Sequence, residues 1–377
     1  MRWLLLNITF FFLLSCTQIK EEQQQSDAYQ AGFKTIHIVD TSRIYKPKTD
    51  TSNYLHYRPI DIDLWYPATV TKTDSTIMFR DILGLLEARA NYYTASNSAN
   101  GFTQQIAQYL CEGFKCSDTT KLLNYRTGTY KNATPAASKF PLVIYLCAFN
   151  GMSYENYSLF ETLAAKGFAV ASISSIGRYP GDMTMKFDDI MEQVNDAVIS
   201  LKQLQQKSNI DFSKIAVVGY SWGGLAAALL VNKISNVTCL VSLDGSEFHH
   251  YGEAKDENDY FNNIVNSTDF KAINITVPYL RLESSPAQTD KEDSVYNFLQ
   301  KVAGEKTIFE IDSAQHEDFG CLSEVIKRSG NCPSNGHYNT ALKLTVSFIE
   351  DHLKNTNTFA HVIEEEKNKI IKKEIKK

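Results

Sequence analysis

The segment Gly219-Tyr220-Ser221-Trp222-Gly223-Gly224 has the residue types and spacing of a catalytic nucleophile. It follows an apolar run at 215–218, typical of a strand, and precedes an Ala/Leu-rich helical pattern. A turn this tight needs glycine on both sides of the serine, because side chains there would collide with the strand and the helix. We therefore expect Ser221 to attack an electrophile. The alternative is a glycine-rich turn that binds phosphate.

A serine nucleophile of this kind needs a general base that comes last in the chain order serine, carboxylate, histidine. His316 is favoured, because it directly follows the last predicted strand, 307–311, in a loop at the same sheet edge. His352 lies inside an amphipathic helical pattern and is expected at the surface. The histidines after Ser221 that are not favoured are His249, His250, His337 and His352.

The carboxylate has more than one candidate. Asp244 ends the predicted strand 238–243, and the carboxyl ends of parallel strands line the functional crevice of such a sheet. Glu283 and Asp290 follow the next predicted strand and are the alternatives. We favour Asp244, which would hold His316 in the correct tautomer and stabilise the imidazolium. A purely structural role for Asp244 would be turn formation ahead of Gly245.

The elements needed to position these residues form a regular alternation. Apolar strand-length runs alternate with amphipathic helical patterns, which predicts an α/β fold with a mainly parallel sheet covered on both faces. The predicted strands are 142–147, 168–173, 215–218, 238–243, 277–282 and 307–311, and the predicted helices are 154–166, 187–206, 222–232 and one around 342–353.

The regions outside this alternation are less regular. Residues 35–39 and 60–66 predict an antiparallel strand pair, and the polar–apolar alternation of the second predicts one solvated face. Residues 78–137 lack a strand pattern and are interpreted as an insertion or lid with a helix near 102–113. Residues 356–377 are a charged tail with no evident role. The catalytic domain is expected to span 31–355.

Composition limits the function classes. Of 377 residues, 43% are hydrophobic and 21% are charged, which excludes a disordered chain. The net charge of −5 lacks the basic excess expected of a generic nucleic-acid binder. No His/Cys spacing matches a zinc site. We expect neither a metal nor an organic cofactor.

The N-terminus has the layout of an export signal. Met1-Arg2-Trp3 precedes a short apolar run that ends at Leu13-Leu14-Ser15-Cys16, too short for a membrane-spanning helix. This ending resembles the lipobox of bacterial lipoproteins. The resemblance implies removal of 1–15, lipid on Cys16, a flexible tether at 16–30 and a lipid-anchored protein of the bacterial envelope, with the outer membrane favoured. The alternative is an ordinary secretory signal with a chance cysteine.

The remaining cysteines are interpreted from that compartment. Outside the cytoplasm, Cys111 with Cys116 and Cys321 with Cys332 are candidate disulfides. Cys147 and Cys239 lie in apolar runs and are expected as buried free thiols.

Taken together, these residues resemble the α/β-hydrolases, and more narrowly the platelet-activating-factor acetylhydrolases and dienelactone-hydrolase-like serine esterases. The resemblance runs from Arg58 to Leu353. The segments that carry it are Arg58-Pro59 with Leu64-Trp65-Tyr66-Pro67, Phe140-Pro141-Leu142-Val143-Ile144-Tyr145, the Gly219–Gly224 turn, Leu243-Asp244, and His316 with Phe319.

One departure concerns the oxyanion hole. Where relatives carry His-Gly, this chain has Cys147-Ala148-Phe149-Asn150-Gly151. By position, the resemblance implies that the backbone N–H groups of Phe149 and Trp222 would hold the oxyanion.

The resulting expectation is a serine carboxylic ester hydrolase that works through an acyl-enzyme. Its substrate would be a small-molecule, lipid or carbohydrate ester, and no nucleic-acid partner is expected. Two alternatives remain: a serine peptidase or amidase of the same fold, and a non-catalytic surface-binding lipoprotein.

Overall fold

The computed structural model describes residues 29–94, 97–114, 117–174, 176–178, 183–207, 209–248, 255–286 and 296–373. The predicted signal segment, Cys16 and nearly all of the predicted tether lie outside these ranges. Within them, no helix combines the length and the apolar character needed to cross a membrane.

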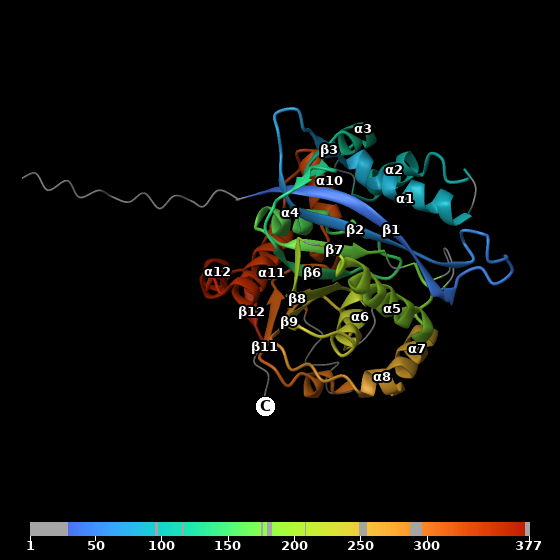
Figure 1. The fold of residues 1–377 in the computed structure, drawn as a ribbon. Helices are drawn as coiled ribbons and strands as arrows, with labels where there is room; N and C mark the ends of the chain where they lie inside the picture. The colour runs from blue at the N-terminus through green and yellow to red at the C-terminus, as the bar shows by residue number, and fades with distance from the viewer. Residues whose placement is uncertain are drawn as a thin grey trace, which may run out of the picture.

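A single twisted sheet organises the described residues, in the order β12-β11-β10-β9-β8-β6-β7-β2-β1-β4-β3, with β5 beside β2 (Figure 1). The pairs from β7 through β6, β8, β9 and β10 to β11 are all parallel, so the predicted fold class is confirmed. The strands are β1 Gln30–Ile44, β2 Tyr57–Thr69, β3 Thr76–Met78, β4 Arg126–Lys131, β5 Thr134–Pro135, β6 Phe140–Leu146, β7 Ala169–Ile173, β8 Ile210–Tyr220, β9 Val237–Leu243, β10 Tyr279–Glu283, β11 Lys306–Ile311 and β12 Ile370–Lys372.

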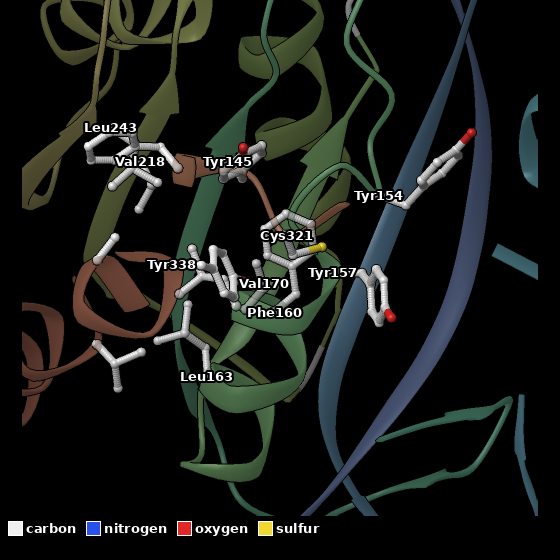
Figure 2. Close-up of a cluster of buried hydrophobic side chains, with 14 of the residues drawn as sticks. Tyr145, Tyr154, Tyr157, Phe160, Leu163, Val170, Val218, Leu243, Cys321 and Tyr338 are labelled. Atoms are coloured by element: carbon white, nitrogen blue, oxygen red, sulfur yellow. The ribbon is translucent and has the colours of Figure 1, made fainter. Parts of the chain in front are cut away.

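Helices cover both faces of the parallel strands. Figure 1 shows α4 (Tyr157–Ala165) and α11 (His337–Lys354) on one side, and α5 (Phe187–Leu204) and α6 (Trp222–Val231) on the other. Alternate residues of β6 point into two separate cores: Val143 and Tyr145 into one, Leu142, Ile144 and Leu146 into the other. This two-sided burial explains the continuous apolar runs of the central strands. The first core includes the tyrosines and phenylalanine drawn in Figure 2.

The predicted solvated face of β2 is wrong. Asp63 is fully buried, because helix α1 (Phe79–Thr94) covers this face and places Arg89 against it. The Arg89 guanidinium donates to Asp63 at 2.7 Å and to Asp61 at 3.1 Å. Ion pairing lets the carboxylates remain under a helix, and the alternation of polar residues therefore marked a buried polar layer.

The segment 78–137 contains strands as well as helices, contrary to the prediction. After α1 come α2 (Phe102–Phe114), which matches the helix predicted near 102–113, α3 (Thr119–Leu123) and β4. Strand β4 extends the main sheet by pairing parallel with β1, where Ala31 opposes Thr129. Its inward-facing residues are Thr127 and Thr129, so the alternation lacked the apolar side chains that make a strand recognisable.

The charged tail also belongs to the fold. Helix α12 (Phe359–Glu366) packs on α11, and β12 pairs antiparallel with β11 at the sheet edge. The buried contact comes from Glu366, which is 2% exposed and accepts hydrogen bonds from Lys343 at 2.7 Å and Thr340 at 2.8 Å. Apolar side chains of the same segment also pack against the core, namely Phe359, Val362, Ile363 and Ile370.

The two predicted disulfide pairs do not form. Cys111 and Cys321 are buried free thiols, and so are Cys147 and Cys239, as expected for the latter two. Cys332 is disulfide-bonded, and its partner lies outside the described residues, as does Cys116.

The reason that Cys321 does not pair with Cys332 is its position in the core. Figure 2 shows Cys321 within the cluster that includes Phe160 and Tyr338. Its Sγ lies 3.3 Å from the carbonyl oxygen of Glu155, to which it donates. Helix α10 (Leu322–Ser329) separates the two cysteines along the chain. Burial raises the pKa of the Cys321 thiol, which further disfavours thiolate chemistry.

Candidate active site

The turn between β8 and α6 holds Ser221 in a strained backbone conformation, with φ 55° and ψ −125°. A Cβ on Gly219 would lie 2.1 Å from the carbonyl oxygen of Gly223, and a Cβ on Gly223 would lie 2.0 Å from that of Leu146. Both glycines are therefore required by the closeness of strand and helix. Strain of this kind persists only where the surrounding structure fixes it, and it is common at functional sites.

The structure brings the three predicted catalytic side chains into one line. The Nε2 atom of His316 lies 2.9 Å from the Oγ of Ser221, and Nδ1 lies 2.7 Å from Oδ2 of Asp244. They come from the turns after β8 and β9 and from the 3-10 helix η2 (His316–Phe319), which follows β11. Both distances suit hydrogen bonds that would pass the serine proton to imidazole and hold the ring in place.

Asp244 is fixed and charged at the carboxyl end of β9. It is 1% exposed, and its Oδ1 accepts the backbone N–H of Ser284 at 2.9 Å. Burial by itself raises the pKa of this carboxyl. The hydrogen bond and charge of His316, with the charge of Arg281, outweigh burial and leave the pKa below its usual value. Asp244 is therefore ionised at neutral pH and suited to stabilise an imidazolium.

Of the alternative acids, the structure describes only Glu283, which pairs with an arginine. Glu283 at the end of β10 is buried and forms an ion pair with Nε of Arg281 at 3.2 Å. Asp290 lies outside the described residues. Glu283 thus belongs to a buried charge cluster below the sheet edge.

Two groups that sequence reasoning missed support the base. The ring of Tyr220 stacks on His316, with centroids 5.1 Å apart and planes inclined by 27°, and its hydroxyl donates to the His316 carbonyl oxygen at 3.0 Å. His337, at the start of α11, places Nδ1 2.8 Å from Oδ2 of Asp318, which also accepts the N–H of Gln315 at 3.0 Å. Tyr220 and His337 therefore fix the loop that carries the base.

The remaining histidines stand apart from the site or outside the described residues. The ring of His352 packs on Phe348, with centroids 4.4 Å apart, far along α11. His249 and His250 lie outside the described ranges. In the described part of the chain, no group of three or more His, Cys, Asp or Glu residues is arranged to hold a metal ion.

The two predicted oxyanion donors follow the carboxyl ends of two neighbouring strands, β6 and β8. Trp222 is the first residue of α6, and its ring contacts that of Phe149 edge to face at 6.2 Å between centroids. Among the described residues, neither backbone N–H has a hydrogen-bond acceptor. Both amides are thus free to receive a ligand oxygen.

A tight turn presents the Phe149 amide. The N–H of Gly151 donates to the carbonyl oxygen of Ala148 at 2.8 Å, and Asn150 has a positive φ of 52°. Inside this turn lies the carboxyl group of Glu155, which sequence reasoning also missed, since no spacing rule marks it.

Comparisons with known proteins agree with this architecture. The BD-FAE family model matches residues 130–308, which include β6, the nucleophile turn and β9. A ferulic acid esterase from Streptomyces cinnamoneus is similar in structure, with 18% sequence identity, a TM-score of 0.59, and coverage of 87% of this chain and 91% of that chain. No curated protein matches the chain.

A second solved structure, DcsB in complex with its substrate analogue, has 15% identity and a TM-score of 0.40 over 58% of this chain and 92% of that chain. The parallel sheet, the strained serine turn after β8 and the structural match to the Streptomyces esterase establish one conclusion: the chain has an α/β-hydrolase fold.

Proposed function

We propose that this protein is a serine ester hydrolase that acts through an acyl-enzyme. The observation that carries the proposal is the continuous contact from Ser221 through His316 to the buried carboxylate of Asp244. The BD-FAE family match over the same strands, and the esterase that shares the fold, support carboxylic ester hydrolysis in particular.

Each residue has a defined part in the proposed reaction. The Oγ of Ser221 attacks the ester carbonyl carbon while Nε2 of His316 takes its proton, and Asp244 stabilises the imidazolium. The amides of Phe149 and Trp222 would hold the resulting oxyanion. When the C–O bond breaks, His316 returns the proton to the leaving alcohol, and water, activated by the same imidazole, then releases the acid and restores the serine.

The substrate class that we propose is a small-molecule carboxylic ester. The ring of Phe149 is only partly buried, so we infer that it contacts the acyl group, whereas the ring of Trp222 is 2% exposed and belongs to the core. The name of the Streptomyces esterase makes feruloyl esters one member of the panel to assay, together with short p-nitrophenyl esters and acetylated sugars.

The test is the Ser221→Ala variant, assayed with short p-nitrophenyl esters and with matched p-nitroanilides. We expect ester turnover to fall by about 10⁴-fold or more, because both the nucleophile and its covalent intermediate are lost. Ser213→Ala is the control, since Ser213 is an exposed residue of the same strand. Retained ester turnover in Ser221→Ala would contradict the proposal, and anilide turnover above ester turnover would favour an amidase.

A further inference from the structure

The turn at 148–151 presents the Phe149 amide, and one side chain fills its inner side. Oε1 of Glu155 accepts the N–H of Ala148 at 2.9 Å and the hydroxyl of Tyr145 at 3.0 Å. A Cβ on Gly151 would lie 2.4 Å from Oε2, so this carboxyl group also packs directly on the far end of the turn. The Glu155 carboxyl thus fixes both ends of the turn.

The same part of the chain holds the loop that carries the base. The carbonyl oxygen of Glu155 accepts the N–H of Cys321 at 3.1 Å. The side-chain amide of the next residue, Asn156, donates to the carbonyl oxygen of Phe319 at 3.0 Å. Phe319 is the last residue of η2, which begins at His316. Glu155 and its neighbour therefore connect the turn beneath the oxyanion site with the segment that carries the base.

Among the described residues, the titratable groups that interact with Glu155 are tyrosines and cysteines, which are neutral at pH 7. Those that face it are Tyr145 from β6, Cys147 just after that strand, Tyr220 from β8, the adjacent Tyr154, and Cys321 before α10. Burial raises the pKa of Glu155 to about 8, against the lowering effect of the hydrogen bonds from Ala148 and Tyr145. The side chain is thus mainly protonated at neutral pH and ionises as the medium becomes alkaline.

We propose that Glu155 is a positioning residue that holds the Phe149 amide in place for the oxyanion and connects that amide to the base loop. This inference rests on the proposed esterase function. In the protonated state the carboxyl supports the turn without adding charge. Once ionised, it places a negative charge beside the site where the oxyanion develops, which disfavours the transition state.

The experiment compares Glu155→Ala, Glu155→Gln and the wild type. The first measurement is the rate at which a fluorophosphonate probe phosphonylates Ser221, which depends on the oxyanion site and needs no knowledge of the natural ester. The second is kcat and KM for a p-nitrophenyl ester, measured from pH 6.5 to 9.5. Glu161→Gln is the matched control: Glu161 is partly buried, with its pKa raised to about 7 by burial, but its carboxyl group accepts a hydrogen bond from Thr129 of β4 at 2.6 Å rather than from a catalytic loop.

We expect Glu155→Ala to lower kcat and the labelling rate by roughly 10- to 100-fold with KM nearly unchanged, since an oxyanion donor is misplaced. Glu155→Gln should restore most of the rate at pH 7, because its amide oxygen can accept the Ala148 N–H. Its rate should also persist above pH 8, where that of the wild type falls. Glu161→Gln should follow the wild type throughout.

Labelling of Glu155→Ala at the wild-type rate would overturn the inference, and so would a Glu155→Gln profile that superimposes on the wild type above pH 8. If Glu155→Ala does not fold, as judged by circular dichroism, the alkaline profile of Glu155→Gln decides alone. A wild type that is neither labelled at Ser221 nor active on esters would instead refute the proposed function, and the inference with it.

Discussion

At the scale of single residues, Gly223 has two tasks, because its backbone both closes the nucleophile turn and begins the helix under Ser221. Its missing side chain lets the start of α6 approach the end of β6, where the Leu146 carbonyl oxygen lies 2.0 Å from the position of a Cβ. Backbone atoms on both sides leave no flexible group that could move away. The conformation of Ser221 and the placement of the Trp222 amide therefore depend on this one glycine.

We expect Gly223→Ala to destabilise the fold by about 2–4 kcal/mol, because the added methyl overpacks a backbone contact. Ester turnover should fall further than stability alone explains. Gly84→Ala is the control: Gly84 lies within α1 with no atom within 4 Å of an added Cβ, so stability should rise by about 0.5–1 kcal/mol. Urea unfolding and p-nitrophenyl ester assays measure both effects. A Gly223→Ala variant as stable and active as the wild type would contradict this argument.

The glycine spacing, the chain order and the positions of Asp244 and His316 directly after predicted strands were sufficient to predict which serine, aspartate and histidine the fold would bring together. Those rules apply because the carboxyl ends of parallel strands meet at one sheet edge. Tyr220, His337 and Glu155 were not predictable, because each acts through a contact between loops that are far apart in sequence. Nothing in their local spacing distinguishes them from ordinary polar residues.

At the scale of elements, a buried carboxylate helps to attach the last segment of the chain, beside the apolar contacts of α12 and β12. Glu366 of α12 accepts hydrogen bonds from Thr340 and Lys343 of α11 and from Lys369 at 2.8 Å, just before β12. Burial raises the pKa of this carboxyl, but the hydrogen bonds of Lys343, Lys369 and Thr340 outweigh it and lower the pKa to about 2. The folded state therefore binds the ionised form more strongly than the unfolded chain does.

Glu366→Gln should cost about 1–3 kcal/mol of stability at pH 7, the usual contribution of hydrogen bonds to a charged group. Because the folded pKa lies below the unfolded one, this contribution is complete above pH 4.5 and declines as the pH falls towards 2. The difference in free energy of unfolding between the variant and the wild type should therefore become smaller at acid pH. Glu364→Gln, with a side chain 69% exposed on the same helix, should change stability by less than about 0.5 kcal/mol. Urea titrations at pH 7 and pH 3.5 test this, and a gap independent of pH would refute it.

The elements that were predicted correctly are those whose burial shows in their own residues. The strands from β6 to β11 and helices α5, α6 and α11 have apolar faces, and their positions followed from period and order. Elements held by polar contacts were missed or misinterpreted: β4 through its threonines and the polar face of β2 through Arg89. Helix α12 was missed although Phe359, Val362 and Ile363 pack against the core, because a run of charged residues directly follows them. The spacing of apolar residues in a sequence cannot reveal an element that packs through ion pairs with a distant segment of the chain.

At the scale of the whole molecule, the described chain begins beside the amino-terminal end of β6, and the triad lies at the carboxyl ends of the parallel strands. The N–H of Tyr29 donates to the Ala165 carbonyl oxygen, and its ring packs on Phe140, the first residue of β6, at 5.1 Å. Ser221 and Asp244 follow the other, carboxyl ends of β8 and β9. A lipid at Cys16, if attached as the sequence predicts, would reach the fold through about 13 residues, which span at most about 45 Å.

This geometry predicts that an anchor at Cys16 and catalysis at Ser221 are independent. Expressed with its signal segment, the wild type should partition into the detergent phase, because buried acyl chains supply roughly 0.8 kcal/mol per methylene. Cys16→Ser should stay in the aqueous phase and hydrolyse a soluble p-nitrophenyl ester within about twofold of the wild type, since the triad faces away from the point of attachment. Recovery of both proteins in the aqueous phase would favour the secretory alternative. A large loss of activity in Cys16→Ser would show that the anchor contributes to the active site, contrary to the arrangement of the sheet.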